Sequence, residues 1–122
     1  MNDNDKSKRY DLEDRTEQFA LDVRAFVRRI PKTPYNQDDL LQLLRSSGSV
    51  GANYIEANKC LGRRDFRMRI KISKKESKES RFWLRVLNAD ADQHLNQQRL
   101  HLIQEATELM CIFGAILQKV GP

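Results

Sequence analysis

The fold depends on residues 65–88, which read DFRMRIKISKKESKESRFWLRVLN and contain neither Gly nor Pro. From Phe66 to Ile72, apolar residues alternate with Arg or Lys, and such alternation is typical of a β-strand. The residues from Lys74 to Leu87 follow without a turn signal, and their composition favours a helix. No other segment alternates comparably, so a strand here would lack a partner. The stretch therefore predicts one helix over residues 65–88.

A helix over this stretch has one face made of apolar and small side chains. Its members are Phe66, Ile70, Ser73, Ser77, Ser80, Leu84 and Leu87. The three serines in the middle of this face leave room for a second helix to approach closely. The facing helix must then be lined by small residues as well, and residues 46–52 (SSGSVGA) meet this requirement.

Residues 46–52 have two interpretations. Taken alone, the segment is a loop or a helix break, because each Gly in a helix interior costs about 1 kcal/mol relative to Ala. Residues at helical spacing nevertheless continue through it and on both sides of it. They form the stripe Leu41, Leu44, Gly48, Ala52 and Ile55. This periodicity favours one helix from a cap near Asp38 to about residue 58, with an apolar face that opens with Leu40, Leu41, Leu43 and Leu44.

Two further helices flank this pair. The first runs over residues 12–30, where apolar residues recur every three or four positions, and it ends before Pro31. The second runs over residues 94–119. Residues 1–10 are mostly charged or polar and predict a disordered arm. The remaining residues, 11–122, predict one folded domain.

The last helix, with Asp92 among its candidate caps, has two apolar stripes. One is Leu100, Ile103, Thr107, Met110 and Leu117, and the other is Leu102, Ala106, Leu109, Phe113, Ile116 and Val120. One stripe is enough for a bundle core, so the other would stay exposed unless a second subunit covers it. Four helices joined by short connections predict an all-α, up-down antiparallel four-helix bundle that forms homo-oligomers.

The chain has 122 residues, which predicts a single domain, and its formal net charge is +5. The charge is unevenly distributed. Residues 59–85 carry eleven Lys or Arg and three Asp or Glu, a net charge of +8, whereas residues 1–58 sum to −1 and residues 86–122 to −2. Half of the cations thus lie in less than a quarter of the chain, and this segment is the chief indication of function.

The basic residues of this segment form the candidate nucleic-acid site. They are Arg63, Arg64, Arg67, Lys71, Lys74, Lys75, Lys78, Arg81 and Arg85. Arg and Lys pair with phosphates, and the interleaved Phe82 and Trp83 offer surfaces on which bases stack. The alternative is a solvated helix face that is partly neutralised by Glu76, Glu79 and nearby acidic helices. The charge pattern by itself leaves both interpretations open.

A polar stripe occupies one side of the helix that ends near residue 58. It consists of Arg45, Ser49, Asn53 and Glu56. A buried stripe of this kind must be hydrogen-bonded, and Glu56 is expected to pair with a basic residue of the 65–88 helix. The stripe is either a ligand or RNA contact or a network that fixes helix register or a subunit contact, and we favour the network. A third interpretation is a hydrolase dyad of Glu56 and Glu79, which requires a shared cleft.

Other kinds of site find little support in the sequence. His94 and His101 have no Cys or carboxylate at ligand spacing, so neither a metal nor a cofactor is expected. Cys60 and Cys111 form no disulfide framework, which favours a reducing, cytoplasmic setting. The uninterrupted apolar runs are too short for a membrane span. The sequence thus predicts a cytoplasmic protein that is not an enzyme.

Two stretches carry a recognisable pattern. One is the spacing Arg45-x-x-x-Ser49-x-x-x-Asn53-x-x-Glu56, and the other is Asp65-Phe66 followed by Ile72, Glu76, Glu79 and residues 80–85 (SRFWLR). Together they resemble the second and third helices of a bacterial family of four-helix bundle proteins, first described from intervening sequences of 23S rRNA genes. The resemblance covers residues 10–120. It implies that Arg45, Ser49, Asn53, Glu56 and Glu79 are signature positions, none of them catalytic.

The resemblance also implies an assembly. It suggests four antiparallel helices per subunit and a homopentameric ring, in a family whose biological role is mostly unassigned. A related branch, the accessory proteins of diversity-generating retroelements, forms basic pentamers that bind nucleic acid and a reverse transcriptase. We therefore expect a non-enzymatic oligomer that binds structured RNA or DNA through the basic surface of its third helix. The alternative is a protein–protein interaction scaffold or accessory subunit that docks an acidic partner and does not bind nucleic acid.

Overall fold

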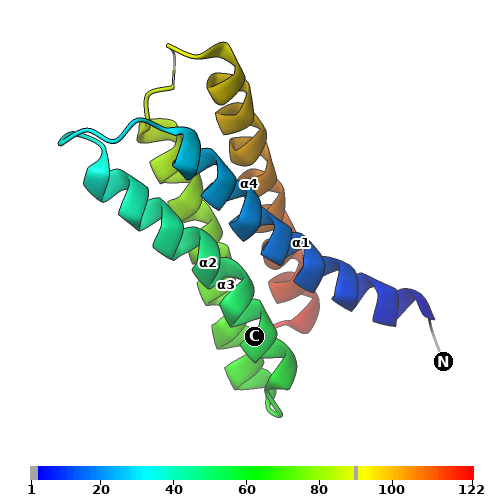
Figure 1. Ribbon diagram of the computed structural model, residues 1–122. Coiled ribbons are helices and arrows are strands. Elements are labelled where there is room, and N and C mark those ends of the chain that lie inside the picture. The colour runs from blue at the N-terminus through cyan, green and yellow to red at the C-terminus, as the bar shows by residue number, and fades with distance from the viewer. Residues whose placement is uncertain (1–2, 90) are drawn as a thin grey trace.

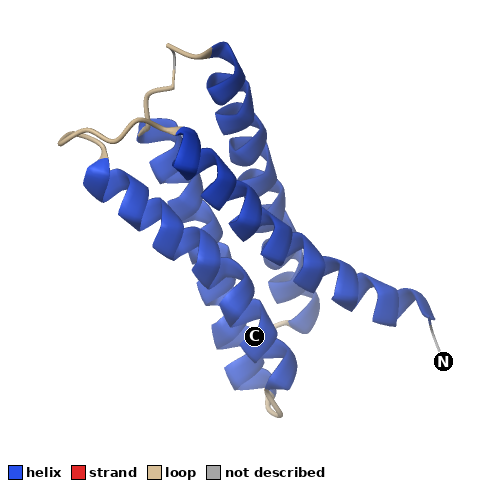
Figure 2. Ribbon diagram, viewed as in Figure 1, coloured by secondary structure: helices blue, strands red, loops and turns tan. Residues whose placement is uncertain are grey.

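Four α-helices make up most of the described chain, which comprises residues 3–89 and 91–122, with side chains from residue 12 onward. In this computed structural model they are α1 (Asp3–Arg29), α2 (Gln37–Lys59), α3 (Arg63–Val86) and α4 (Gln93–Val120). No strand occurs among the described residues (Figure 1; Figure 2). Each helix packs against the next along the chain, and α1 also packs against α4. The predicted all-α four-helix bundle is confirmed.

The stretch that alternates like a strand lies within α3. Its buried members are Ile70, Ser73, Glu76, Ser77, Ser80, Leu84 and, just after the helix, Leu87. This confirms the predicted inner face, except that Phe66 is only half-buried and Glu76 joins the face. Met68, which the alternation would place beside Ile70, is 55% exposed. Helical spacing, and not alternation, therefore decides which residues are buried.

The small residues of α2 and α3 face each other, as the sequence predicts. Ser73 Oγ donates a hydrogen bond to the Val50 carbonyl oxygen at 2.9 Å. Two helical turns further along α3, Ser80 Oγ donates a hydrogen bond to Ser46 Oγ of α2 at 2.9 Å. Small side chains let the two backbones approach, and the hydroxyls satisfy one another in the interior. No buried side-chain nitrogen or oxygen in the described part of the chain lacks a hydrogen-bond partner.

The close approach of α1 to α2 explains why residue 51 of α2 is a glycine. A Cβ at residue 51 would lie 2.9 Å from Thr16 Oγ1 and 3.2 Å from Thr16 Cβ, which is too close for ordinary contact. Thr16 is fully buried and its hydroxyl donates to the Glu13 carbonyl at 3.0 Å, so it has little freedom to move aside. Gly51 therefore makes room for α1, and it does so within an unbroken α2.

Helix α2 is confirmed, and its predicted apolar face is confirmed in part, because Leu40 and Leu43 are buried and Leu44 packs against the core. Leu41 and Ile55 are 60% and 41% exposed, and Ala52 is exposed as well. The buried residues occupy neighbouring positions instead, namely Leu40, Leu43, Ser46, Ser47, Val50, Gly51, Tyr54 and Ala57. Because α2 lies between α1 and α3, its buried face must turn toward both helices. The predicted stripe lies at the outer edge of that face, on the side of α1.

The two apolar stripes of α4 both belong to the bundle. Leu102, Ala106, Leu109 and Phe113 of one stripe lie in the core. Of the other stripe, Ile103, Thr107, Met110 and Leu117 are half-buried. The prediction that this second stripe needs another subunit is wrong, because α3 runs along it, and only Leu100 is exposed. The second apolar stripe of α4 therefore does not by itself indicate an oligomer.

α4 begins as predicted at an Asp92 cap, whose carboxylate accepts a hydrogen bond from the Leu95 backbone N–H at 3.1 Å. Among the described helices it is the one that is long and apolar enough to be a candidate membrane span. In the bundle, however, its core stripe is buried, and Ile112 and Ile116 pack against the core. The cytoplasmic location stays a prediction.

α1 begins at Asp3, earlier than the residue 12 that the sequence predicts, and its first turns extend beyond the other helices (Figure 1). Residues 1–2 and the side chains of residues 3–11 lie outside the described part of the chain. The disordered arm at residues 1–10 therefore stays a prediction. From residue 12 onward α1 contributes Leu12, Phe19, Val23, Phe26 and Val27 to the core, and Ile30 directly after the helix is buried as well.

An ion-pair cluster ties α1 to α4. The Arg15 guanidinium lies 2.7 Å from Glu105 and 2.9 Å from Glu108. The hydrogen bond to Glu105 is the main reason that the pKa of Arg15 is raised. The pKa of Glu108 is lowered, first by a hydrogen bond from Gln104 and second by the one from Arg15. The cluster holds the two helices that pack least extensively against each other.

Candidate nucleic-acid interface

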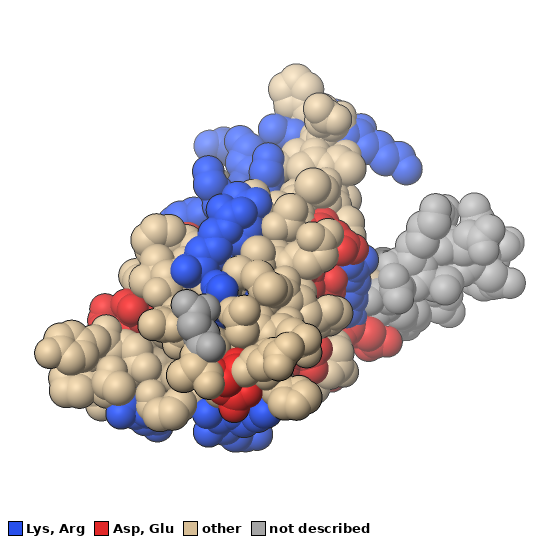
Figure 3. All heavy atoms as spheres, turned by 90° about the horizontal axis from the view of Figure 1, so that it is seen from above, with Lys and Arg blue, Asp and Glu red and all other residues tan. Residues whose placement is uncertain are grey.

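One outward face of α3 carries all nine cations of the predicted site. They are Arg63, Arg64, Arg67, Lys71, Lys74, Lys75, Lys78, Arg81 and Arg85, and we call this surface the basic face. At 100° per residue their positions fall within about one third of the helix circumference. The face extends along about 33 Å of helix. Seen from above, a band of Lys and Arg side chains runs across the side of the molecule on which α3 lies (Figure 3).

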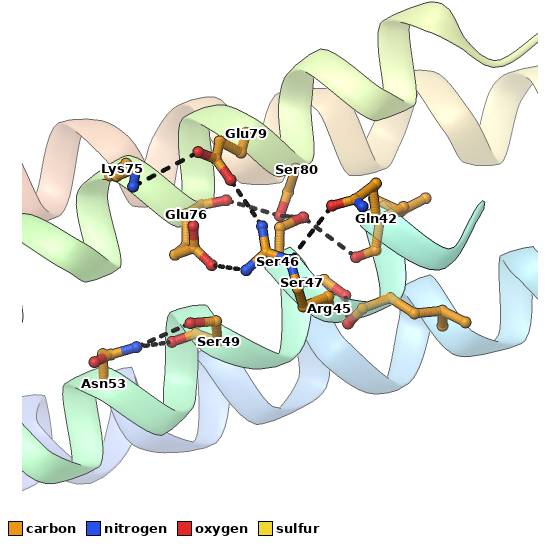
Figure 4. Close-up of polar contacts among 12 residues, drawn as sticks. Gln42, Arg45, Ser46, Ser47, Ser49, Asn53, Lys75, Glu76, Glu79 and Ser80 are labelled. Atoms are coloured by element: carbon orange, nitrogen blue, oxygen red, sulfur yellow. Dashed lines mark hydrogen bonds and ion pairs between the residues drawn. The ribbon is translucent and has the colours of Figure 1, made fainter. Parts of the chain in front are cut away.

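The two glutamates in the middle of α3 do not lie on the basic face. Both point toward α2, where Arg45 Nη1 lies 2.9 Å from Glu76 Oε2 and Arg45 Nη2 lies 3.0 Å from Glu79 Oε2 (Figure 4). The hydrogen bond to Glu76 is the main cause of the raised pKa of Arg45. On the basic face, only Lys75 makes an ion pair within the described chain, at 3.9 Å from Glu79. Glu76 and Glu79 of α3 thus pair mainly with Arg45 of α2.

Two arginines of the basic face are oriented by neutral groups of α4. Arg67 donates to the backbone carbonyls of Leu117, at 3.1 Å, and of Gly121. Arg81 donates to Thr107 Oγ1 at 3.4 Å. Such acceptors fix a guanidinium without cancelling its charge. The six other cations make no hydrogen bond or ion pair within the described chain, namely Arg63, Arg64, Lys71, Lys74, Lys78 and Arg85. Glu76 and Glu79 pair mainly with Arg45, so their neutralisation of this face is limited to the contact of Glu79 with Lys75.

The basic face is hollowed at the start of α3. A surface hollow of about 370 Å³ is lined by Arg63, Arg64, Arg67, Met68, Lys71 and Pro122. The long stems of the arginines form much of its wall, and their charged groups surround it. The helix begins here at Gly62, which makes no side-chain cap, so the positive end of the α3 dipole adds to the same charge. This end of the face is suited to an anionic group such as a phosphate.

The other end of the basic face carries aromatic side chains. Phe82 is 55% exposed, whereas Trp83 is half-buried and packs against the core. The two rings meet edge to face, with their centroids 4.9 Å apart and their planes at 79°. Both rings are candidate stacking surfaces in the sequence, although a lone Trp is more often a core or interface residue. In the structure Trp83 packs against the core and contacts Phe82, which is the more exposed ring.

The polar stripe of α2 forms hydrogen bonds mostly within the protein. Asn53 Nδ2 donates to both the carbonyl and the hydroxyl oxygen of Ser49 at 2.9 Å (Figure 4). Asn53 Oδ1 in turn accepts from Arg69 of α3 at 2.9 Å. Together with the Arg45 contacts, these bonds join α2 to α3 at two levels. The geometry supports the predicted network, and Arg69, the α3 cation absent from the predicted site, belongs to it.

Glu56 does not make the predicted contact. Its side chain is exposed and forms no ion pair or hydrogen bond to α3 within the described chain. Arg45 contacts Glu79, and Glu56 lies eleven residues from Arg45 along α2, a rise of about 16 Å. Glu56 and Glu79 therefore share no cleft, and the hydrolase dyad is ruled out by geometry.

The described residues contain no group of three or more His, Cys, Asp or Glu side chains that could hold a metal ion. Cys60 is half-buried and Cys111 is exposed, and both are free thiols. The Cys60 thiol donates to the Glu56 backbone carbonyl at 3.3 Å. The basic face of α3 is thus the surface on which a functional interpretation depends.

Comparison with known proteins gives one informative likeness. No protein-family model and no curated protein matches the chain. A solved structure from Bacteroides thetaiotaomicron, described as a protein of unknown function from the S23 ribosomal protein family, superposes with a TM-score of 0.76. The two are 26% identical, and the match covers 89% of this chain and 96% of the other. The likeness therefore extends over nearly the whole bundle.

Proposed function

We propose that this protein binds structured RNA or DNA through the basic face of α3 and that it does so without catalysing a reaction. The observation that carries the proposal is the arrangement of charge on α3. Nine cations share one face, while Glu76 and Glu79 point away from it and pair with Arg45. Separation of the nine cations from Glu76 and Glu79 would not stabilise a helix face that contacts only solvent. A polyanion supplies the missing negative charge.

The binding rests on phosphate contacts. A nucleic-acid duplex carries a phosphate about every 3.4 Å along each strand, so a basic face of about 33 Å spans several of them. Contacts of Lys and Arg with phosphates supply affinity and orientation but read no sequence. Arg67 and Arg81 are already oriented by α4, which lowers the entropy that they lose on binding. We therefore expect binding that depends strongly on salt and little on sequence.

A titration of labelled structured RNA at two salt concentrations tests the proposal. If about six phosphates are contacted, affinity should fall roughly 10³-fold between 50 mM and 200 mM salt. Fluorescence anisotropy measures both dissociation constants on one RNA. Absence of binding at 50 mM salt would overturn the proposal. Capture of an acidic protein with which RNA does not compete would favour the interaction-scaffold alternative instead.

We also propose that the chain belongs to the family of proteins from 23S rRNA intervening sequences and assembles as a homopentamer. The α2 and α3 signature patterns and the likeness to the Bacteroides structure support family membership. The surface available for assembly is not the α4 stripe but exposed apolar residues elsewhere, such as Leu41 and Ile55 on α2. Five copies would multiply the basic face fivefold. Light scattering at micromolar concentration measures the assembly, and a monomer would contradict it.

The sequence favours a reducing compartment, because its two cysteines form no disulfide framework. We therefore place the proposed activity in the cytoplasm, where structured RNA is abundant. No membrane and no cofactor takes part in the proposal.

A further inference from the structure

Phe82 differs from the other exposed apolar residues of α3 by its surroundings. It is 55% exposed, and single exposed apolar residues are common on protein surfaces. Lys78 lies one turn before it and Arg85 about one turn after it, so all three side chains share one stretch of the helix surface. Neither cation makes an ion pair or hydrogen bond within the described chain. An apolar ring is thus set between two uncompensated positive charges.

The ring of Phe82 is also held in place. Trp83 meets it edge to face at a centroid distance of 4.9 Å, and Trp83 is itself packed against the core. Arg81, which precedes Phe82, bonds to Thr107 of α4 and so fixes the helix at this level. A supported ring that remains more than half exposed costs little further entropy when a flat partner stacks on it. This is the arrangement that single-strand-binding surfaces use, namely a stacking platform beside cations.

We propose that Phe82 stacks against an unpaired base of the bound nucleic acid, while Lys78 and Arg85 contact the phosphates on either side. The inference rests on the proposed function and narrows its ligand to nucleic acid with unpaired nucleotides. In a duplex each base is already stacked and paired, so its flat face is not available to Phe82. A loop, a bulge or a single strand presents that face. The hollow at the start of α3 then receives a phosphate further along the same strand.

Variants of Phe82 test the stacking contact. The probes are a labelled 12-nucleotide oligouridylate and a duplex RNA of the same length. Phe82→Ala should lower affinity for the single strand about tenfold and leave affinity for the duplex within twofold. Phe82→Tyr keeps a flat ring and should retain single-strand affinity. The matched control is Val86→Ala, which shortens another exposed apolar side chain one turn further along α3 and should change neither affinity.

Trp83 provides an independent measurement, because it is the chain's only tryptophan and it touches Phe82. Oligouridylate should change its emission in the wild-type protein, and this change should be lost in Phe82→Ala. An unchanged single-strand affinity in Phe82→Ala would overturn the stacking proposal, and so would an equal loss on both probes. Salt-dependent binding of the duplex would survive in either case and would leave the proposed function in place. If neither the oligouridylate nor the duplex bound the wild-type protein or its variants at low salt, the stacking proposal and the proposed function would both be overturned.

Discussion

Reversing two charges, Lys71→Glu together with Lys78→Glu, is expected to weaken RNA binding about 100-fold at fixed low salt. Both lysines lie on the basic face, and neither makes an ion pair or hydrogen bond within the described chain. Their replacement removes two phosphate contacts and sets two negative charges against the phosphate backbone. The slope of log affinity against log salt should also become shallower by about 2. Fluorescence anisotropy with labelled RNA measures both effects.

The matched control is Arg28→Glu together with Lys32→Glu. These two exposed cations lie at the end of α1 and in the loop after it, and neither belongs to the basic face. Both double variants have the same net charge, so a difference between them reports the position of the charge and not its amount. We expect the control to bind RNA within about threefold of the wild type. An equal loss in the two double variants would mean that overall charge, and not the basic face, attracts RNA.

The helices of this protein are predicted well from its sequence, because helix formation leaves a periodic trace in a single segment. The stretch 65–88 is the clearest case. Its alternation suggests a strand, yet its length, its lack of turn signals and its helix-forming composition correctly indicate a helix. The small-residue segment 46–52 is also predicted to be helical and to face α3, and the Ser73 and Ser80 contacts confirm it.

Which side of each helix is buried is predicted less well. The outer stripe through Leu41 and Ile55 satisfies the same three-and-four spacing as the buried residues beside it. The choice between them depends on where α1 and α3 lie around α2, and spacing within one helix contains no such information. The second stripe of α4 illustrates the same limit, because α3 covers it and no property of α4 alone reveals that neighbour.

The cations of the candidate site are visible in the sequence, but the reason for their isolation is not. The sequence leaves open whether Glu76 and Glu79 partly neutralise the basic residues of this segment. In the structure both point toward α2, because the Ser73–Val50 and Ser80–Ser46 contacts set the level at which the two helices meet. That level brings Arg45 to the glutamates and leaves Glu56 far from them. Register between helices depends on such contacts, which follow only from the folded arrangement.

Arg45 therefore connects stability with function. It is a structural residue of α2, yet its pairing with Glu76 and Glu79 holds both carboxylates on the side of α3 that faces α2, where only Glu79 also reaches a lysine of the basic face. The same contact lets α3 bury a glutamate among its serines without an unpaired charge in the core. The family resemblance implies that Arg45 and Glu79 are signature positions, and the ion pair gives a physical reason for that implication.

Arg45→Ala is expected to lower the free energy of unfolding by about 2–3 kcal/mol. Its main partner, Glu76, has a side chain that is only 5% exposed, so removal of Arg45 leaves a buried carboxylate without its cation. Loss of one partner of a fully buried pair costs about 3–5 kcal/mol, and the half-exposed position of Arg45 reduces that cost. Urea denaturation at neutral pH measures the loss as a lower midpoint with an unchanged slope.

Two further variants separate the buried charge from the other contacts of Arg45. Glu79→Ala removes the more exposed pair and should cost less than about 1 kcal/mol, as is usual for pairs near the surface. Glu76→Gln in the Arg45→Ala background removes the stranded charge while nearly conserving volume, so it should recover about half of the lost stability or more. If the double variant were no more stable than Arg45→Ala alone, the cost would come from lost packing of the arginine stem. The buried Glu76 carboxylate would then not be what Arg45 stabilises.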